Sequence, residues 1–345
     1  MTSLAQKDTR LPVHVITGFL GSGKTSLLRD ILKDPAFEDT AVLINEFGEV
    51  GLDHLIAREV SEDVLLLDSG CLCCSAGDDL GSSLLDLLDL RRAGEADFER
   101  IIIETSGLAD PGPIVRLVMT DPSIGRHFRM GNVVTVIDGV NGDATLKHYA
   151  EAQQQIAMSD VVLLTKEDLV PQDRLTALGN AALTLNPVST RIDRVGLRDI
   201  LLGATVRPQQ STQPNIGCTA SDHLHSQEHT HMHTQGMTSF VVTIEEPVNL
   251  QRFIRWLELL LKARGDTILR VKGLLAVKGE TRPRVLQAVQ TMVYPLDALK
   301  AWPNGSGMQT QIVFIGRYIS ASAIERSLKQ YVTVDTKAAS LEPES

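Results

Sequence analysis

In the N-terminal part of the chain, short and nearly unbroken apolar runs alternate with longer amphipathic stretches. Runs of this kind predict strands that are covered on both faces. The predicted strands are 13–17, 41–45, 64–67, 101–104, 133–138 and 161–165. Helical spacing predicts helices over 25–32, 80–92, 113–119 and 151–158. The alternation predicts an α/β fold with a doubly wound, mostly parallel sheet.

A polar stretch separates this first domain, residues 11–206, from a second patterned region. The stretch 207–237 is rich in Gln, Ser, Thr, Pro and His, so we interpret it as a flexible linker. Beyond it we expect a smaller α+β domain over 238–332 and a disordered tail over 333–345. Its strands are predicted at 240–244, 268–277, 284–293 and 311–315, and its helices at 250–262 and 321–329. The pattern of 284–293 also permits a helix at its start.

Composition narrows the class of protein. With 345 residues, 43% of them hydrophobic and 22% charged, the chain can build two ordinary globular cores. The formal net charge of −10 argues against nucleic acid and against an anionic membrane surface as partners. No apolar run approaches the length of a membrane span, and the N-terminus lacks the apolar stretch of a signal peptide. We therefore expect a cytoplasmic protein.

The segment after the first predicted strand fits the pattern G-x-x-x-x-G-K-[ST] and opens a predicted helix. Such a loop wraps phosphate groups with its backbone N–H groups. Lys24 is expected to reach the β- and γ-phosphates, and the Thr25 hydroxyl to bind Mg²⁺. The nucleotide-binding residues predicted here are Gly18, Gly21, Ser22, Gly23, Lys24, Thr25 and Ser26.

Glu104 ends the apolar strand 101–104, the position from which a carboxylate holds or orients the magnesium shell. A simpler interpretation is that Glu104 caps the next segment. Beside the phosphate loop we favour the first interpretation, and we name Lys24, Thr25 and Glu104 as the catalytic residues.

Thr165-Lys166-Glu167-Asp168 follows the sixth predicted strand, where GTPases carry an Asn/Thr-Lys-x-Asp segment that binds guanine. The Asp168 carboxylate can accept two hydrogen bonds from guanine, a pair that adenine cannot supply. Thr165 stands where Asn is commoner. The alternative is a surface loop of mixed charge. We predict that Thr165, Lys166 and Asp168 bind the base.

Cys71, Cys73 and Cys74 follow the predicted strand 64–67, so three sulfurs lie on one short segment. Thiolates favour Zn²⁺, Cu(I) or iron–sulfur chemistry over Mg²⁺ or Ca²⁺. A tetrahedral site would need a fourth ligand from elsewhere or from water. Buried structural cysteines and a redox-active thiol pair remain as alternatives.

Two further segments carry candidate metal ligands. Glu49 lies in 45–51, after the second predicted strand, and could supply an oxygen ligand or respond to the γ-phosphate; the plainer alternative is a solvent-facing charge. In the linker, alternate spacing places His229, His231 and His233 on one side of an extended chain. Imidazole suits Zn, Ni, Cu and Co. A polar linker without a selected role is the alternative.

Together these motifs resemble those of the CobW-type metallochaperone GTPases, relatives of the nickel-insertion GTPases of hydrogenase and urease maturation. The matching segments are 16–25, 45–49, 70–74, 103–111, 165–168 and 271–273. The resemblance covers residues 11–330. It implies a GTPase domain with a smaller C-terminal domain, GTP hydrolysis, and a Cys-x-Cys-Cys site at Cys71, Cys73 and Cys74 that holds transferable zinc, or cobalt in the cobalamin variant.

We therefore expect a GTPase that uses GTP and Mg²⁺ and passes a transition metal, zinc first, to a client metalloenzyme docked on the C-terminal domain. The alternatives are a cobalt chaperone, a P-loop phosphotransferase acting on a small molecule, and a metal buffer or sensor without turnover. Nickel is also open as the metal. Oligomeric state is open too, with a homodimer among the alternatives. No water-orienting Gln or arginine finger stands out, so intrinsic hydrolysis is expected to be slow.

Overall fold

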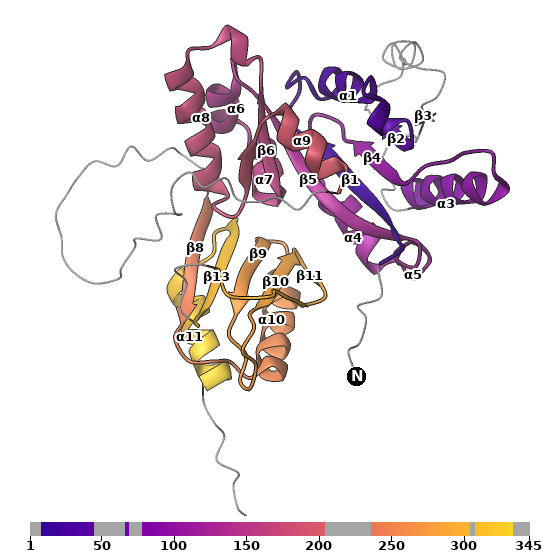
Figure 1. The fold of residues 1–345 in the computed structure, drawn as a ribbon. Helices are drawn as coiled ribbons and strands as arrows, with labels where there is room; N and C mark the ends of the chain where they lie inside the picture. The colour runs from indigo at the N-terminus through magenta and orange to yellow at the C-terminus, as the bar shows by residue number, and fades with distance from the viewer. Residues whose placement is uncertain (1–7, 45–65, 69–77, 204–235, 304–307, 334–345) are drawn as a thin grey trace, which may run out of the picture. The chain divides into compact units, whose positions relative to one another are not determined.

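The computed structural model describes residues 8–44, 66–68, 78–203, 236–303 and 308–333. The chain divides into two compact units, Met1–Gln235 and Gly236–Ser345 (Figure 1). The linker predicted at 207–237 and the tail predicted at 333–345 lie almost wholly outside the described residues. No helix among the described residues is long and apolar enough to cross a membrane.

The first unit is built on a seven-stranded parallel sheet with the order β3-β2-β4-β1-β5-β6-β7. Its strands are β1 (Leu11–Thr17), β2 (Thr40–Ile44), β3 (Leu66–Asp68), β4 (Arg100–Glu104), β5 (Phe128–Asp138), β6 (Val161–Thr165) and β7 (Thr190–Ile192). The predicted fold class is confirmed, and each of the six predicted strands overlaps one of these. Strand β7 was not predicted.

Helices cover both faces of this sheet. They are α1 (Lys24–Leu32), α3 (Asp78–Ala93), α4 (Gly112–Thr120), α5 (Pro122–Gly125), α6 (Gly142–His148), α7 (Ala150–Met158), α8 (Gln172–Leu185) and α9 (Arg194–Leu201). Leu28 of α1 and Leu197 of α9 pack in one buried cluster with sheet residues that include Val134 and Val136. Thr135 alternates with these valines, and its hydroxyl donates to the Gln155 carbonyl of α7 on the other face (2.9 Å).

Four neighbouring strands end together at one edge of the sheet. Glu104 ends β4 and pairs with Ile16 of β1, while Asp138 ends β5 and pairs with Thr165, the last residue of β6. In open parallel sheets ligands bind outside the carboxyl ends of the strands. The fold therefore brings the phosphate loop, Glu104 and the segment after β6 to the same edge.

The second unit contains a six-stranded antiparallel sheet with the order β11-β10-β9-β13-β8, in which β12 also pairs with β10. Its strands are β8 (Met237–Ile244), β9 (Ile268–Leu275), β10 (Arg284–Val289), β11 (Met292–Val293), β12 (Asp297–Ala298) and β13 (Thr310–Arg317). Its helices are α10 (Leu250–Arg264) and α11 (Ala321–Leu328), and a short π-helical turn follows at Lys329–Thr333. The α+β class predicted for this region is confirmed.

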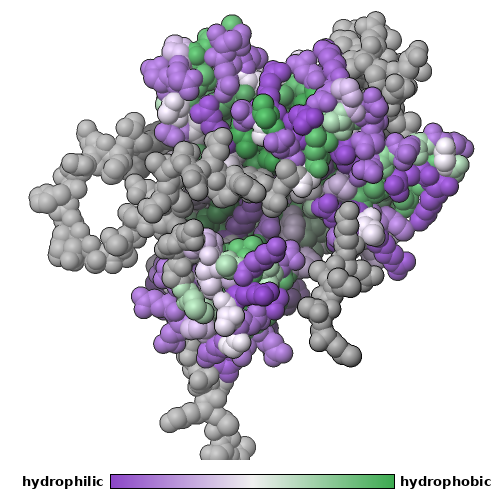
Figure 2. Space-filling model, viewed as in Figure 1, coloured by the Kyte–Doolittle hydropathy of each residue, from purple (hydrophilic) through white to green (hydrophobic). Residues whose placement is uncertain are grey.

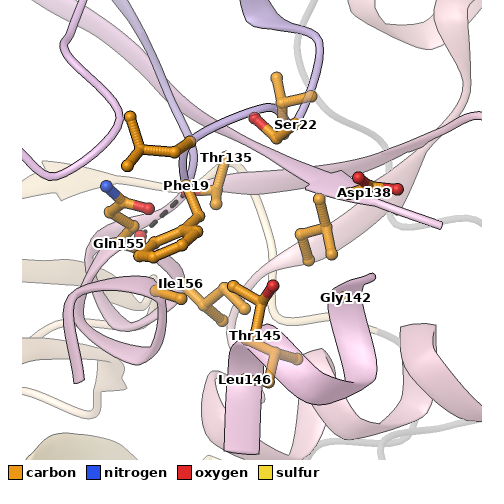
Figure 3. A pocket seen from close by; sticks show the side chains of 13 residues that line it. Phe19, Ser22, Thr135, Asp138, Gly142, Thr145, Leu146, Gln155 and Ile156 are labelled. Atoms are coloured by element: carbon orange, nitrogen blue, oxygen red, sulfur yellow. Dashed lines mark hydrogen bonds between the residues drawn. The ribbon is translucent and has the colours of Figure 1, made fainter. Parts of the chain in front are cut away.

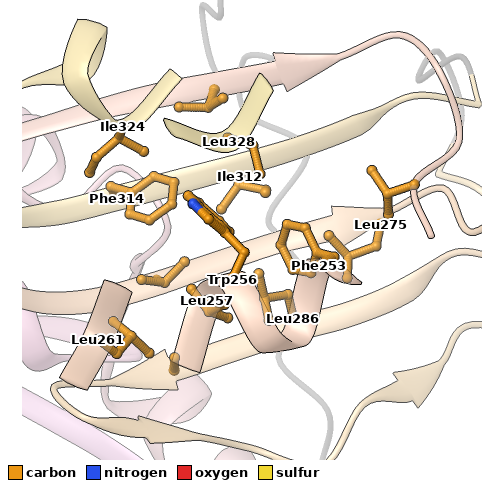
Figure 4. Close-up of a cluster of buried hydrophobic side chains, with 14 of the residues drawn as sticks. Phe253, Trp256, Leu257, Leu261, Leu275, Leu286, Ile312, Phe314, Ile324 and Leu328 are labelled. Atoms are coloured by element: carbon orange, nitrogen blue, oxygen red, sulfur yellow. The ribbon is translucent and has the colours of Figure 1, made fainter. Parts of the chain in front are cut away.

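One face of α10 packs into the core of the second unit. Phe253, Trp256 and Leu257 are buried against Phe314 of β13 (Figure 4). The Trp256 indole N–H donates to the Ser327 hydroxyl of α11 (3.0 Å), so the polar edge of the ring is satisfied inside the core. The apolar spacing along α10 thus accounts for the helix and for its burial.

The segment 284–293 is a hairpin, so the helix considered for its start is wrong. Ala288 pairs with Val293 and Val289 with Met292. The chain turns at Gln290, whose φ is 49°. Gln and Thr carry little turn propensity, because Gly, Asn or Asp normally supply positive φ. A single strand was therefore the natural prediction.

A buried histidine in β1 gives the first unit a pH-dependent stability. The His14 side chain is 2% exposed, its Nδ1 accepts from the Asn132 amide (3.1 Å), and its Nε2 has no hydrogen-bond partner among the described residues. Burial, reinforced by the positive charges of Arg129 and Arg100, lowers the pKa of His14 to about 4. The imidazole is therefore neutral in the folded protein.

We expect the free energy of unfolding to fall by about 3 kcal/mol between pH 6.5 and pH 4 because of His14 alone. In that range the unfolded chain binds a proton that the folded protein does not. Above pH 6.5 the imidazole is neutral in both the folded and the unfolded chain, so His14 does not lower the free energy of unfolding there. His14→Asn keeps an acceptor for the Asn132 amide and should lose this part of the pH dependence. Urea unfolding of both proteins from pH 4 to 7.5 measures it, and parallel curves would refute it.

Candidate nucleotide site

The phosphate loop, residues 18–25, joins the end of β1 to the start of α1. Gly18 has φ 148° and Gly23 has φ 89°, conformations that residues with side chains rarely adopt. A Cβ atom at Gly18 would also collide with the carbonyl oxygen of Val136. Gly23 caps α1 without a side chain, and the first turn of α1 contains no acidic residue. Because no side chain caps the start of α1, this helix N-terminus suits an anion such as phosphate.

Lys24 lies folded along its own loop. Its side chain is 8% exposed, and its Nζ donates to the carbonyl oxygen of Gly18 (2.8 Å) and, more weakly, to that of Phe19 (3.4 Å). A buried ammonium group at the start of a helix is suited to bind phosphate oxygens. The structure thus places the ammonium group of Lys24 beside the loop that the sequence motif defines.

Thr25 and Glu104 meet across the sheet edge. The Thr25 hydroxyl donates to Oε1 of Glu104 (2.6 Å), and Glu104 is 4% exposed. A hydroxyl and a buried carboxylate at this spacing offer the oxygen donors that Mg²⁺ prefers. The structure therefore brings together two predicted residues that lie far apart in the sequence, and their donor set fits magnesium. Ser26, also predicted here, is exposed in the first turn of α1.

The segment after Glu104 packs against the phosphate loop. A Cβ atom on Gly107 would lie 2.7 Å from both the backbone N and the Cα of Leu20. The Gln155 side chain of α7 donates to the carbonyl oxygens of Gly107 and Ala109, each at 3.1 Å. Gln155 is 1% exposed. Helix α7 thus holds this segment in place, a role that sequence reasoning missed.

The segment after β6 supports the phosphate loop from behind. The Thr165 hydroxyl donates to the carbonyl oxygen of Ser22 (2.6 Å), and Lys166 Nζ donates to that of Gly21 (3.0 Å). Lys166 has φ 55° and is 37% exposed at its side chain. Two consecutive residues therefore hold two consecutive carbonyl groups. Thr165 is positioned to support the loop, and its contact with the base stays a prediction from the sequence.

Asp168 lies in the short 3₁₀ turn Glu167–Leu169 and is exposed. The turn is tied to β7 because Arg191 Nη2 donates to Glu167 Oε1 (3.1 Å). The Asp168 carboxylate is thus accessible at the edge where nucleotide would bind. Strand β7, although not predicted, fixes the position of this turn.

Replacing the Thr165 hydroxyl should weaken nucleotide binding. In Thr165→Val the carbonyl oxygen of Ser22 loses its buried donor, which costs about 1–3 kcal/mol. We expect the dissociation constants of GDP and GTP to rise about tenfold together, because both nucleotides use the phosphate loop. Isothermal titration calorimetry measures this. Thr165→Ser keeps the hydroxyl and should stay near the native value, whereas equal weakening in Val and Ser would contradict this role.

A pocket of about 300 Å³, counted with its open mouth, lies on the α7 side of the phosphate loop (Figure 3). Its walls come from the phosphate loop, β5, α6 and α7, and they are mainly apolar. The Phe19 ring lies within it and packs on Tyr149 with ring centroids 4.5 Å apart. The hollow thus lies on the face of the sheet that α7 covers, opposite the face that α1 covers.

The predicted transition-metal ligands lie outside the described residues. These are Glu49, Cys71, Cys73, Cys74, His229, His231 and His233. In the part of the chain that the structure describes, no group of three or more His, Cys, Asp or Glu residues could hold a metal ion. The metal site therefore stays a prediction from the sequence.

Comparison with known proteins identifies the same two parts of the chain. Residues 12–192 match the family described as CobW/HypB/UreG, nucleotide-binding domain, and residues 237–332 match the cobalamin synthesis protein cobW C-terminal domain. The two matches fall on either side of the division between the compact units.

Individual relatives are similar to this chain along most of its length. The zinc chaperone YjiA of Escherichia coli (strain K12) is 32% identical over 312 residues, covering 89% of this chain and 94% of the relative. The zinc chaperone CobW of Sinorhizobium sp is 28% identical, covering 95% and 98%. The crystal structure of Zn(II)-bound YjiA GTPase from E. coli superposes with a TM-score of 0.70 at 26% identity, covering 93% and 99%. The chain belongs to the CobW/HypB/UreG family of P-loop GTPases, among the members that carry a CobW C-terminal domain.

Proposed function

We propose that this protein is a GTP-hydrolysing metallochaperone that binds zinc and releases it to a client protein. The observation that carries the proposal is the joined nucleotide site, in which Thr25 contacts Glu104 while Thr165 and Lys166 hold the phosphate loop. Two relatives that cover most of the chain are named zinc chaperones. Thiolate chemistry suits a reducing compartment, so the cytoplasm is the proposed location.

In the hydrolysis step, Lys24 binds the β- and γ-phosphates, and the glycines of the loop allow close approach of the backbone. Magnesium, when bound, neutralises the charge that develops on the phosphate oxygens. Thr25 and Glu104 would hold it, because their oxygens meet at the edge beside the loop. Asp168 accepts the two guanine N–H groups and so selects GTP over ATP.

The metal cargo is bound by Cys71, Cys73 and Cys74, with Glu49 and the histidines His229, His231 and His233 as further ligands. Thiolates bind zinc, cobalt and nickel, and we propose zinc first because the relatives are named for it. In the sequence the cysteines follow β3 and Glu49 follows β2, two strands that are neighbours in the parallel sheet. We propose that GTP tightens the metal site and that hydrolysis loosens it.

The client is proposed to dock on the C-terminal domain. Gly236–Ser345 carries 14 Lys and Arg against 10 Asp and Glu, a net charge of +4, which leaves −14 on Met1–Gln235. Most of the described surface in Figure 2 is hydrophilic. Complementary charge steers association more than it raises affinity. A client with an acidic docking face fits this contrast.

Two measurements test the proposed function. Phosphate release with GTP and with ATP should show turnover of GTP alone, and transfer of the phosphoryl group to an added small-molecule acceptor would favour a phosphotransferase. Titration of zinc and of cobalt with a GTP analogue, with GDP and without nucleotide should show tightest binding of zinc with the analogue. Equal zinc affinity in all three states would refute the coupling and favour a metal buffer.

A further inference from the structure

Asp138, the last residue of β5, belongs to none of the motifs above, yet both oxygens of its carboxylate accept hydrogen bonds. Oδ1 accepts from the amides of Val140 (2.8 Å) and Asn141 (3.3 Å). Oδ2 accepts from the Asn141 side chain (3.0 Å) and from Lys166 Nζ (2.8 Å). The Asp138 side chain is 8% exposed. The carboxylate is therefore held rigidly by the turn that follows β5, and it presents one oxygen to Lys166.

The same Lys166 ammonium group reaches the phosphate loop. It donates to the carbonyl oxygen of Gly21 (3.0 Å) as well as to Asp138. The backbone of Lys166 is in the left-handed region, with φ 55°. This conformation costs free energy in a residue with a side chain, and here it accompanies a side chain that lies across the loop. The lysine therefore bridges a fixed carboxylate on one side and the phosphate loop on the other.

The carboxylate of this pair is ionised at neutral pH. Burial alone would raise the pKa of Asp138, but the hydrogen bonds from Lys166, from the Asn141 side chain and from the two amides lower it below its usual range. An ammonium group that is partly exposed would otherwise extend into solvent, where its side chain gains rotational freedom. The attraction of the carboxylate offsets that gain.

We propose that Asp138 is a positioning residue of the nucleotide site: it holds Lys166 across the phosphate loop so that the lysine stem forms a wall for the base. The inference rests on the proposed function, because it assumes that guanine lies beside Lys166 and Asp168. It adds Asp138, at the end of β5, to a nucleotide site whose other residues belong to or follow β1, β4 and β6. Asp138 touches neither base nor phosphate in this assignment and acts through Lys166.

A double-mutant cycle of Asp138→Asn and Lys166→Met tests the proposal. In Asp138→Asn the new side-chain amide oxygen can still accept from the Val140 amide, so the turn keeps its cap, while the charge that faces Lys166 is lost. Lys166→Met removes the charged end and keeps a stem of similar length. Asp143→Asn is the matched control, because Asp143 lies on neighbouring α6 and pairs with Arg174 (3.3 Å) at a half-exposed site.

We expect each single variant of the pair to raise the KM for GTP about tenfold while kcat changes less than about threefold. The double variant should raise the KM no further than Lys166→Met alone, because Asp138 acts only through the lysine. The control should match the native protein. Thermal unfolding of each variant checks the fold, and Asp138→Ser serves as the second variant if Asp138→Asn does not fold.

Two results would overturn the inference. One is a KM in the double variant that is about a hundredfold raised, the product of two independent effects. The other is an Asp138→Asn protein that matches Asp143→Asn. Failure of the proposed function is a different result, since the native protein would then neither bind nor hydrolyse GTP.

Discussion

We expect the Lys24→Ala protein to hydrolyse GTP at least about a hundredfold more slowly than the native protein. The reason is the position of Nζ, which is held 2.8 Å from the carbonyl oxygen of Gly18 and is buried at the start of α1. Charge builds on the phosphate oxygens as the γ-phosphate leaves, and a fixed ammonium group in a site with little water stabilises that charge strongly. Phosphate release at saturating GTP measures the effect on kcat.

The control for this variant is Lys33→Ala. Lys33 caps the other end of α1, pairs with Asp30 (3.3 Å) and is 63% exposed at its side chain. Its removal should leave hydrolysis unchanged, because a surface ion pair contributes little. A Lys24→Ala protein that still turns over GTP at the native rate would remove Lys24 from the catalytic residues.

Replacing Cys71, Cys73 and Cys74 together by serine should weaken zinc binding by more than about a thousandfold. Zinc sites built from four protein ligands bind with about 10–16 kcal/mol, so the loss of three thiolates removes most of that free energy. Serine hydroxyls are not deprotonated at neutral pH and are poor ligands for a soft cation. Competition with a fluorescent zinc chelator, in the presence of a GTP analogue, measures the dissociation constant.

Cys218→Ser is the matched control for the thiol count, since Cys218 lies apart from the other three cysteines in the sequence. It should retain native zinc affinity. The triple variant should also keep native GDP affinity, because the phosphate loop is built from other residues. Unchanged zinc affinity in the triple variant would place the metal site elsewhere in the chain.

Strong periodicity explains why the sheet could be predicted. Ile101, Ile102 and Ile103 are all buried, as an unbroken apolar run in a parallel sheet requires. The edge strand β7 has only the three half-buried residues Thr190–Ile192, and such a short segment gives no periodic signal. Helices α6, α8 and α9 were not predicted either, although α8 buries Leu175, Leu178 and Ala182 at helical spacing. Local pattern therefore predicts the central strands of the sheet but not its short edge strand β7.

The residues of the candidate site also fall into those that the sequence predicts and those that only the structure reveals. The phosphate loop and Glu104 follow from motif and strand position, and the structure brings Thr25 and Glu104 into contact. The support given by Thr165 depends on how β6 approaches a loop more than a hundred residues earlier in the chain, so no local pattern reveals it. A signal for Asp138 did exist, because it ends a strand at the ligand-binding edge.

The bracing of the phosphate loop by Thr165 and Lys166 has a consequence for the energetics of nucleotide capture. Two hydrogen bonds restrain consecutive carbonyl groups of the loop, so less backbone entropy has to be lost when GTP binds. The hydrogen bond from Lys24 Nζ to the Gly18 carbonyl oxygen likewise restrains the ammonium group beside the loop. A loop restrained in this way lowers the conformational cost of capturing a nucleotide, so contacts outside the phosphate pocket contribute to its affinity.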